Sequence, residues 1–488
     1  MFNILFAAAE VEPYAKTGGL ADVAGALPKA LKALGHDVRV VMPRYWGVDR
    51  ERYKLTLMEG ALGVEMGIMG TQWAGVYEGR MGEVPVYFIE HEGYFGRKGL
   101  YDEGGFSYID NDNRFIFFAK AVMQLAKKLR FHPHVVHAND WHTATLPILL
   151  NTTYAFDSDF AHAGAMLTIH NMQHQGKFYE GAMNVLDVGW SHFNADELEE
   201  FGGINWLKGG IVHADVITTV SPKYAREIQT SEYGWGLEGL LQRYSYKLHG
   251  ILNGVDYTQW NPAVDKHIAT PYDIDTLEAK AASKKALQEE FGLSVRADVP
   301  LIGMVGRLAH QKGIELLAQS LHGLLHMEVQ IVVLGAGETW AEHFLSDVAA
   351  RFGDKFRCYI GYRDDLAHRI EAGSDMFLMP SLFEPCGLNQ IYSLRYGTLP
   401  IVRATGGLDD TVENYNPATG EGNGFKFWDA SWQALTGTVA WAIDTYVNHP
   451  DHFTAMQKRA MAARFDWHKA ALEYTALYER IVAHRHHT

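Results

Sequence analysis

The chain of 488 residues is long enough for about two to four domains, and its 47% hydrophobic and 21% charged residues are typical of a globular protein. Asp and Glu (58) outnumber Lys and Arg (43), so the formal charge is −15 and no nucleic-acid partner is expected. Two cysteines, Cys358 and Cys386, cannot build a disulfide framework, which favours a reducing, cytoplasmic compartment.

The N-terminal stretch MFNILFAAAEVEP is the first predicted strand. It has neither the basic start nor the cleavage site of an export peptide. No apolar stretch of the sequence approaches the roughly 20 residues that a membrane helix needs, so we expect no membrane partner.

Short apolar runs alternate with helix-like stretches along the whole chain. The first series is FNILFAAA, DVRVVMP, VPVYFIE, HVVHAND, AMLTIHN and DVITTVS; the second is PLIGMVGR, VQIVVLGAG, FRCYIGY, DMFLMPS and TLPIVRA. Continuous runs rich in Val and Ile predict parallel strands that are buried on both faces, with helices between them. The sequence therefore predicts an α/β protein with two doubly wound domains that face a shared cleft. Ligands of such sheets bind outside the carboxyl ends of the strands.

A turn-rich stretch, ILNGVDYTQWNPAVDKHIATPYDIDT, separates the two series and is interpreted as the crossing between domains. We expect a first domain over residues 1–250, a second over 251–463, and a final amphipathic helix within 464–488. The tetrapeptide TGGL occurs at residues 17–20 and again at 405–408, each time after an apolar run. This short repeat is a weak indication of duplication.

The stretch KTGGL follows the first predicted strand and opens a helix. Gly18 and Gly19 would let backbone N–H groups approach an anion, and Lys16 adds a full positive charge. The motif is neither the dinucleotide fingerprint G-x-G-x-x-G nor a P-loop. The alternative is a tight turn with a solvated lysine.

The stretch GRLAHQKG follows the first strand of the second series. Arg307 and Lys312 are five residues apart between Gly306 and Gly313, and a helix follows. Two cations beside a helix terminus predict a diphosphate site. The alternative is an ordinary polar loop.

The stretch EPCGLNQ places Glu384 just before a helix that is expected to begin near Gly387. Its carboxylate and the neighbouring backbone N–H groups could hold a polyol, or Glu384 could simply cap the helix. Cys386 has no basic surroundings in the sequence and is interpreted as a small buried thiol.

Polar side chains also follow two strands of the first series, in HVVHANDWH and TIHNMQH. They are His137, Asn139, Asp140 and His142, and then His170, Asn171 and His174. Their spacing fits neither HExxH nor a Cys/His zinc pattern, so we expect hydrogen bonds to a sugar or to its acceptor and no metal. For His170, a satisfied structural histidine is the alternative.

The motifs KTGGLADV, HANDWH, TIHN, GRLAHQKG, EPCGLNQ and TGGLDDTV, in this order, resemble those of bacterial and plant-type glycogen and starch synthases. The resemblance covers nearly the whole chain. It implies a GT-B fold of two Rossmann-like domains, with the last helix returning to the first domain. It also implies transfer of glucose from ADP-glucose to the non-reducing 4-OH end of an α-1,4-glucan, with retained configuration, release of ADP, and neither cofactor nor metal.

The resemblance also implies roles for individual residues. Catalytic roles fall to Arg307 and Lys312 at the diphosphate, Glu384 at the glucose hydroxyls, His170 near the 6-hydroxyl, and Asp140 on the acceptor side. The implied substrate-binding residues are Lys16, Thr17, Gly18, Gly19, Asp22, Trp141, Asn253, Tyr362 at the adenine, Cys386, Gly387, Leu388, Thr405, Gly406 and Gly407. Many related GT-B enzymes carry a second glutamate eight residues after the first, commonly on the ribose, where this chain has Tyr392.

Two other classes of protein remain open from the residues alone. A nicotinamide-dependent oxidoreductase would share the doubly wound sheets, although the glycine fingerprint is absent after every predicted strand. A glycan-binding protein without activity would use Trp141 and other aromatics as sugar platforms.

Overall fold

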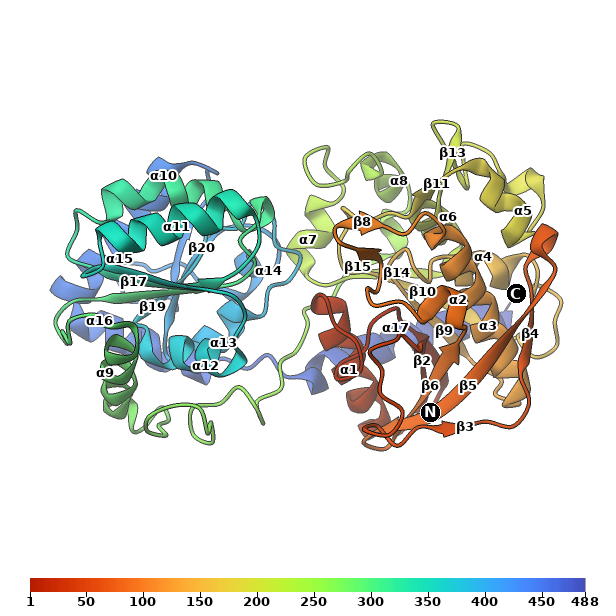
Figure 1. Cartoon of the computed structure of the whole chain (residues 1–488), viewed down its shortest axis with the longest axis horizontal. Helices are drawn as coiled ribbons and strands as arrows, with labels where there is room; N and C mark the ends of the chain where they lie inside the picture. The colour runs from red at the N-terminus through yellow and green to blue at the C-terminus, as the bar shows by residue number, and fades with distance from the viewer. Residues whose placement is uncertain (488) are drawn as a thin grey trace. The chain divides into compact units, whose positions relative to one another are not determined.

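The computed structural model describes residues 1–487, with side chains through residue 485, and the chain divides into two compact units (Figure 1). Unit 1 comprises Met1–Val220, Ala225–Gly254 and the C-terminal segment from Trp467. Unit 2 comprises Ser221–Tyr224 and Val255–Asp466, so the chain changes unit within α7 (Pro222–Glu227) and again near residues 254 and 466.

Unit 1 is built on a large sheet whose parallel part runs in the order β15-β14-β10-β9-β1-β2-β6. These strands are β1 (Asn3–Ala7), β2 (Asp37–Pro43), β6 (Val84–Glu90), β9 (Val135–Asn139), β10 (Gly164–Ile169), β14 (Val216–Thr219) and β15 (Leu248–Gly250). Their buried apolar side chains explain the continuous runs in the sequence. The strand order reverses between β1 and β9, which makes that point the switch point of the sheet.

An antiparallel extension completes the edge of this sheet, and the strand prediction missed it. It consists of β5 (Thr71–Met81), which pairs with β6, and of β3 (Thr56–Leu57) and β4 (Leu62–Glu65), which pair with β5. A tight turn at Gly82, with a positive φ of 63°, joins β5 to β6. Buried and more exposed positions are mixed along β5, so it lacks the continuous apolar run by which the other strands were recognised.

Smaller elements surround the sheet of unit 1. The helices are α1 (Gly19–Ala33), α2 (Glu92–Phe95), α3 (Asn111–Lys128), α4 (Thr145–Asn151), α5 (Met183–Leu186), α6 (Trp206–His213), α8 (Glu238–Arg243) and α17 (Trp467–His487). Two small antiparallel sheets are formed by β11 (Lys177–Phe178), β13 (Gly203–Asn205) and β12 (Glu199–Glu200), and by β7 (Asp102–Glu103) with β8 (Phe106–Ser107).

The last helix, α17, packs on unit 1 against α1, β9 and β10. The Tyr478 hydroxyl lies 2.8 Å from His137 Nδ1, and His36 Nε2 lies 3.1 Å from Thr475 Oγ1. Burial lowers the pKa of His137 to about 3, so this histidine is a neutral structural group that ties α17 to the sheet.

Unit 2 contains a fully parallel sheet in the order β18-β17-β16-β19-β20-β21. Its strands are β16 (Leu301–Val305), β17 (Gln330–Gly335), β18 (Phe356–Ile360), β19 (Met376–Met379), β20 (Leu399–Arg403) and β21 (Phe425–Phe427). Numbered along the chain within the unit, the order is 3-2-1-4-5-6, the Rossmann order, and it reverses between β16 and β19. The predicted strands of both series are all found, and the two Rossmann-like sheets confirm the predicted fold class.

Helices cover both faces of the sheet in unit 2. They are α9 (Lys280–Phe291), α10 (Ile314–Leu324), α11 (Thr339–Arg351), α12 (Asp364–Gly373), α13 (Asn389–Arg395), α14 (Gly406–Thr411), α15 (Trp432–Asn448) and α16 (Pro450–Ala462). One core forms under α10, α11, α15 and α16, and a second forms under α9 and α12 on the opposite face (Figure 1). Strands buried on both sides in this way hold their carboxyl ends in fixed register.

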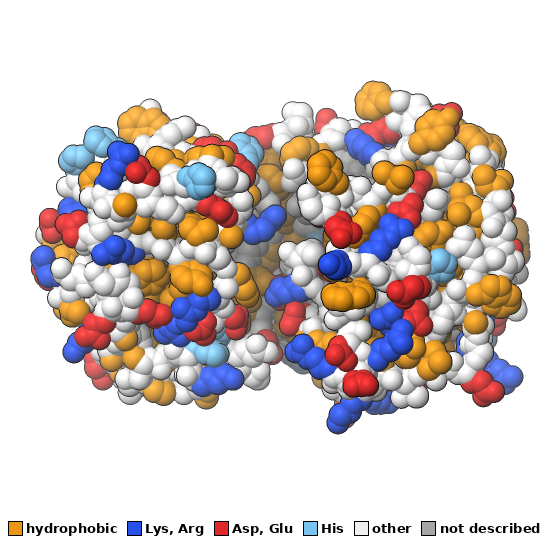
Figure 2. Space-filling model, viewed as in Figure 1, with side chains coloured by type: hydrophobic (Ala, Val, Ile, Leu, Met, Phe, Trp, Pro, Cys, Tyr) orange, Lys and Arg blue, Asp and Glu red, His pale blue; other side chains and the backbone are white. Residues whose placement is uncertain are grey.

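Acidic and basic side chains are interspersed over the visible face of each unit (Figure 2). An anion bound to this acidic chain therefore needs cations placed locally at its site. Within residues 1–487, no helix combines the length and the apolar character required to cross a membrane.

Candidate active site

The switch point of unit 2 brings together two motifs that lie far apart in the sequence. Arg307 follows β16, and Lys312 ends the short 3-10 helix His310–Lys312 before α10. Glu384 follows β19, the neighbour of β16 in the sheet. Because the carboxyl ends of β16 and β19 meet at the same edge, the predicted diphosphate and sugar residues share one location.

Lys312 and Glu384 form an ion pair at this edge. Lys312 Nζ lies 2.6 Å from Glu384 Oε2, and Ser381 Oγ donates to the same oxygen at 3.0 Å. The Glu384 side chain is 7% exposed and that of Lys312 22%, so the pair is largely shielded from water. Glu384 therefore has a fixed ionic partner 72 residues away, which the interpretation as a helix cap did not include.

Arg307 is exposed, and its guanidinium donates to Gln311 Oε1 at 3.3 Å. Gln311 in turn donates to the Phe383 carbonyl at 3.3 Å, and its own carbonyl accepts from the Leu382 amide at 2.9 Å. Gln311 thus joins the loop of Arg307 to the loop of Glu384. Sequence reasoning missed this residue, because its role depends on contacts with a distant loop.

Gly313 fixes the turn between Lys312 and α10. Its φ is +70°, and a Cβ there would lie 2.0 Å from the Pro380 carbonyl oxygen. The glycine therefore allows close approach between the loops after β16 and β19.

The second TGGL segment packs against the loop of Glu384. A Cβ on Gly406 would lie 1.8 Å from the Glu384 carbonyl oxygen, and one on Gly407 would lie 2.0 Å from the Cys386 carbonyl oxygen. The Gly407 amide donates to the Glu384 carbonyl at 3.1 Å, and Thr405 is 1% exposed. These glycines hold the loop backbone in place, and their predicted contact with substrate stays a prediction.

The remaining predicted residues of unit 2 lie around the same edge. Cys386 is 4% exposed, and Gly387, with a φ of +74°, precedes α13 together with Leu388. Tyr362 follows β18 and is 79% exposed, and its predicted contact with the adenine stays a prediction.

Tyr392 occupies the position where related enzymes carry a second glutamate. Its ring stacks on Trp260 at 4.0 Å with an interplanar angle of 6°, and Trp260 also stacks on His368 at 3.7 Å. Tyr392 of α13 therefore belongs to a group of stacked rings with Trp260 and with His368 of α12.

The switch point of unit 1 carries the KTGGL turn after β1 and the polar residues after β9. The Lys16 ammonium lies 2.6 Å from the Asp22 carboxylate on α1. The Thr17 and Gly18 amides donate to the Glu10 carboxylate, which also accepts from the Thr17 hydroxyl at 2.6 Å.

Glu10 is a residue that sequence reasoning missed. It is 4% exposed, and it also accepts a hydrogen bond from the Tyr101 hydroxyl at 2.7 Å. A lone glutamate after an apolar run, in AAAEVEP, was the available signal. Glu10 satisfies the first amides of the turn, so an anion at this turn would meet Lys16 and the amides beyond Gly18.

Gly18 and Gly19 differ from the glycines of the second TGGL segment. A Cβ built at either position has no atom of the described chain within 4 Å, and the φ of Gly18, −155°, is open to any residue. The fold therefore does not need glycine here, whereas a Cβ on Gly25 would lie 2.7 Å from the Glu12 carbonyl oxygen. Open space at the turn is what close approach of a ligand requires.

We expect Gly18→Ala and Gly19→Ala to change the free energy of unfolding by less than about 0.5 kcal/mol. We expect the same changes to lower the glucose transfer that the resemblance implies by about tenfold or more, because a methyl group would intrude on the bound substrate. Gly25→Ala is the matched control and should cost about 1–3 kcal/mol of stability through overpacking. Urea unfolding and initial rates measure the two effects; full activity in both variants would contradict a ligand contact at the turn.

Asp140 and His170 are joined at the ends of β9 and β10. The His170 amide donates to Asp140 Oδ1 at 2.7 Å, and the Asp140 amide donates to the Thr168 carbonyl at 2.9 Å. Asp140 has a φ of +56°, a region in which Asp and Asn are the common non-glycine residues. Burial raises the pKa of Asp140 to about 7, although backbone hydrogen bonds oppose the shift.

His170 is held as a neutral ring of one tautomer. Burial lowers its pKa to about 3. Asn139 Nδ2 donates to the Ala7 carbonyl at 3.0 Å, so Asn139 Oδ1 is an acceptor, and His170 Nε2, 2.9 Å away, is the donor. The acceptor of the ring is therefore Nδ1, which suits a hydroxyl donor. Asn139, which sets this tautomer, was noted in the sequence as a polar residue without an assigned role.

The raised pKa of Asp140 makes the protein less stable as pH rises. The folded state binds the proton more tightly than the unfolded state, so the stabilising contribution is complete below the ordinary pKa of 3.8 and is lost as pH rises through about 7. We expect Asp140→Asn, which keeps an acceptor for the His170 amide, to gain stability over the original protein as pH rises from 5 to 8, by on the order of a few kcal/mol. The free energy of unfolding of both proteins is measured from pH 5 to pH 8. A difference between them that does not change with pH would refute the raised pKa of Asp140.

Trp141 and Asn253 were both predicted to contact substrate. Trp141 is 9% exposed and packs against Phe115 and Phe178, with ring centroids 5.1 Å and 5.4 Å away. Its ring is packed among other aromatic side chains and does not present a broad face on which a sugar could stack. Asn253 Oδ1 is buried and has no hydrogen-bond partner among the described residues. A buried acceptor in that condition calls for a partner such as a ligand hydroxyl.

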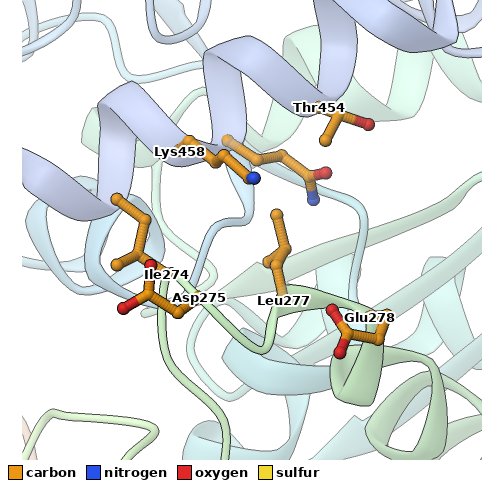
Figure 3. Close-up of a pocket in the computed structure, with 7 residues that line it drawn as sticks. Ile274, Asp275, Leu277, Glu278, Thr454 and Lys458 are labelled. Atoms are coloured by element: carbon orange, nitrogen blue, oxygen red, sulfur yellow. The ribbon is translucent and has the colours of Figure 1, made fainter.

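Unit 2 also contains a pocket of about 280 Å³ (Figure 3). It is lined by Ile274, Asp275, Leu277 and Glu278 from one segment and by Thr454, Gln457 and Lys458 from α16. It contains none of the predicted site residues, and the acidic side chains of its lining do not suit a diphosphate.

Several known proteins are similar to this chain over nearly its whole length. Glycogen synthase 1 of Geobacter sulfurreducens is 56% identical over 485 residues, covering 99% of this chain and 97% of that protein. Glycogen synthase of Anaeromyxobacter is 47% identical, covering 99% and 100%. The solved catalytic domain of starch synthase IV from Arabidopsis thaliana, bound to ADP and acarbose, is 32% identical with a TM-score of 0.90, covering 99% of each chain. Sucrose-phosphate synthase from Thermosynechococcus elongatus shares the fold, at 16% identity and a TM-score of 0.59.

Two family models account for the two series of strands. Residues 3–243 match the starch synthase catalytic domain, and residues 287–460 match the glycosyl transferases group 1. With its two Rossmann-like units and polar residues at both switch points, the molecule is a glycosyltransferase of the GT-B class. The chain belongs to the glycogen and starch synthase family. This membership replaces the dehydrogenase and the inactive glycan binder as interpretations of the sequence.

Proposed function

We propose that this enzyme transfers glucose from ADP-glucose to the non-reducing 4-OH end of an α-1,4-glucan such as glycogen, with retained configuration and release of ADP. The observation that carries the proposal is the Lys312–Glu384 pair beside Arg307 at the switch point of unit 2. One edge of the sheet thus carries two cations that can bind a diphosphate. The same edge carries a carboxylate that can accept hydrogen bonds from sugar hydroxyls. Family membership and the Arabidopsis relative solved with ADP support the choice of donor.

The donor half of the reaction uses residues of unit 2. Arg307 and Lys312 neutralise the negative charge that develops on the departing ADP as the bond from C1 to the phosphate oxygen breaks. Preorganised donors of this kind are each worth about 10²–10³ in rate. Glu384 accepts hydrogen bonds from glucose hydroxyls, and the backbone of Cys386, Gly387 and Leu388 adds donors beside it.

Residues of unit 1 add further contacts to the transferred glucose and to the nucleotide-sugar. His170 Nδ1 accepts a hydrogen bond from the 6-hydroxyl of the transferred glucose, a role that its neutral tautomer allows. Asn253 Oδ1 accepts from a second hydroxyl, which gives this buried oxygen its missing partner. Lys16 contacts the nucleotide-sugar at the open glycine turn, and Asp140 holds the His170 backbone in place.

Retention follows from attack on the face from which ADP leaves. The acceptor 4-oxygen forms the new bond to C1 while the bond from C1 to phosphate breaks, and the 4-OH proton passes to a leaving phosphate oxygen. A double displacement would need a carboxylate nucleophile, and the two carboxylates among the predicted catalytic residues are both engaged, Glu384 with Lys312 and Asp140 with the His170 amide. Capture of a covalent glucosyl ester on either carboxylate would overturn this step.

A donor panel tests the proposal. Purified enzyme, glycogen and either ADP-glucose or UDP-glucose are combined, and nucleotide release is measured together with the configuration of the new linkage by NMR. We expect ADP release with α-1,4 linkages and a clear preference for ADP-glucose. Faster transfer from UDP-glucose would contradict the proposed donor, and glucan binding without nucleotide release would contradict the reaction.

Neither a cofactor nor a metal takes part in the proposed transfer. Two cations and the helix termini at the switch point supply the positive charge that a metal provides in other glycosyltransferases. We therefore expect the initial rate to survive exhaustive treatment with EDTA. A rate that falls with EDTA and returns with Mg²⁺ would show that the cations are insufficient.

A further inference from the structure

A group of metal-ligating side chains lies in unit 1 apart from the residues assigned to transfer. It consists of His192, Glu197 and His213, whose ligand atoms all lie within 4.8 Å of one another. His192 Nδ1 is 2.7 Å from Glu197 Oε2, and His213 Nε2 is 3.1 Å from the same oxygen. The two rings therefore point at one carboxylate oxygen from different elements.

We propose that His192, Glu197 and His213 form a site for a divalent transition metal ion of the Zn²⁺ class. Two imidazole nitrogens and one carboxylate are a ligand set that Zn²⁺ accepts, with a fourth position for water. Zinc sites place ligands about 2.0–2.2 Å from the ion, so the ligand atoms need to separate only slightly from their present spacing.

The ligands are held by surrounding structure before any ion binds. His213 ends α6, and the Asn151 side chain donates to its carbonyl at 2.7 Å. Lys208, on the same helix, donates to the carbonyls of Ala195 and Glu199 at 2.6 Å and 2.5 Å. One helix thus carries one ligand and fixes the loop of another, which is the preorganisation that metal sites require.

The carboxylate is also oriented from outside the group. Asn194 Nδ2 lies 3.2 Å from Glu197 Oε1, which leaves Oε2 facing the two imidazole rings.

A second group in unit 2, formed by His267, Asp364 and His368, is a poorer candidate. His368 Nδ1 is already bound to Asp265 at 2.7 Å, and His368 Nε2 is 4.0 Å from Asp364. Its ring is also stacked on Trp260. This group and the exposed pair of His322 on α10 and His326 just beyond its end, with ring centroids 4.7 Å apart, serve as internal controls.

We expect the ion to link residues 190–197 to α6 and so to stabilise unit 1. We expect it to take no part in the transfer step. Binding to the folded state alone raises the melting temperature by about 3–6 °C when free metal is about 100 times the dissociation constant. The transfer rate at 25 °C should be the same with and without the ion.

The test uses full-length enzyme stripped with EDTA and titrated with Zn²⁺ alone, read by calorimetry and by thermal unfolding. We expect one tight site in the original protein, weakened about 100-fold or more in His192→Ala/His213→Ala and in the isosteric Glu197→Gln. Co²⁺ absorption bands typical of a tetrahedral ion should appear and be lost in the same variants.

Matched controls are His267→Ala and His322→Ala/His326→Ala, in which the tight site should persist. Circular dichroism confirms that each variant is folded, and Glu197→Gln keeps the shape of the cluster if the double variant unfolds. The proposal is overturned if the original protein shows no tight site. It is equally overturned if Glu197→Gln binds Zn²⁺ as tightly as the original protein, or if the control variants lose the site.

Discussion

Arg307→Ala should lower turnover by about 10²–10³ while leaving the thermal unfolding of the enzyme unchanged. The guanidinium is exposed and donates a long hydrogen bond of 3.3 Å to Gln311, so its removal should cost little stability. The loss should appear mainly in kcat, because charge on the leaving ADP develops in the transition state. Initial rates with ADP-glucose and glycogen measure it.

The matched control is Arg351→Ala, which removes another exposed arginine, at the end of α11, whose side chain is 69% exposed and paired with Asp347. Its rate should match that of the original enzyme. The double variant Arg307→Ala/Lys312→Ala should lose about 10⁴ or more. It should also lose about 1–3 kcal/mol of stability, because Glu384 is left buried without its cation. Near-normal turnover in the double variant would remove the diphosphate assignment.

Glu384→Gln should lower kcat/KM for ADP-glucose by about 10²–10³. The amide keeps the shape of the side chain and a hydrogen bond with Ser381, but it loses the charge that strengthens hydrogen bonds to sugar hydroxyls. Lys312, 22% exposed, can turn to water, so the change in stability should stay within about 2 kcal/mol. Steady-state kinetics and urea unfolding separate the two effects.

Glu371→Gln provides the control for loss of a buried carboxylate. Glu371 lies on α12, is 1% exposed, and belongs to no part of the proposed site. Burial raises its pKa well above the ordinary value, which favours the neutral carboxylic acid. The neutral amide of Gln resembles that acid in shape and charge, so the change should leave turnover unchanged. Equal losses of turnover in Glu384→Gln and Glu371→Gln would mean that Glu384 acts through folding and not through the sugar.

The strands of both units could be predicted because parallel strands buried on two faces leave continuous apolar runs. The same argument gave the candidate site residues Lys16, Asp140, Arg307 and Glu384, which all follow such runs and whose contacts with substrate stay predictions. The antiparallel strand β5 was missed because its buried and exposed positions are mixed.

The two TGGL segments show where sequence reasoning stops. Gly406 and Gly407 are required by a loop that the chain brings against them, while Gly18 and Gly19 face open space. The same four residues have different physical roles in the two segments, because the atoms that pack against each segment come from other parts of the chain. For the same reason the Lys312–Glu384 ion pair and the role of Glu10 at its turn could not be read from local sequence.

The packing of α17 on unit 1 has a consequence for synthesis on the ribosome. The helix covers part of the first sheet with Tyr474, Tyr478 and Ile481, all nearly fully buried. Translation at about 5–20 residues per second delivers these side chains only after the whole of unit 2, a delay on the order of tens of seconds. During that interval the apolar surface that α17 covers is exposed on the nascent first unit. We therefore expect this unit to need chaperones until α17 is made. For the same reason we expect truncation of α17 to destabilise the first unit strongly.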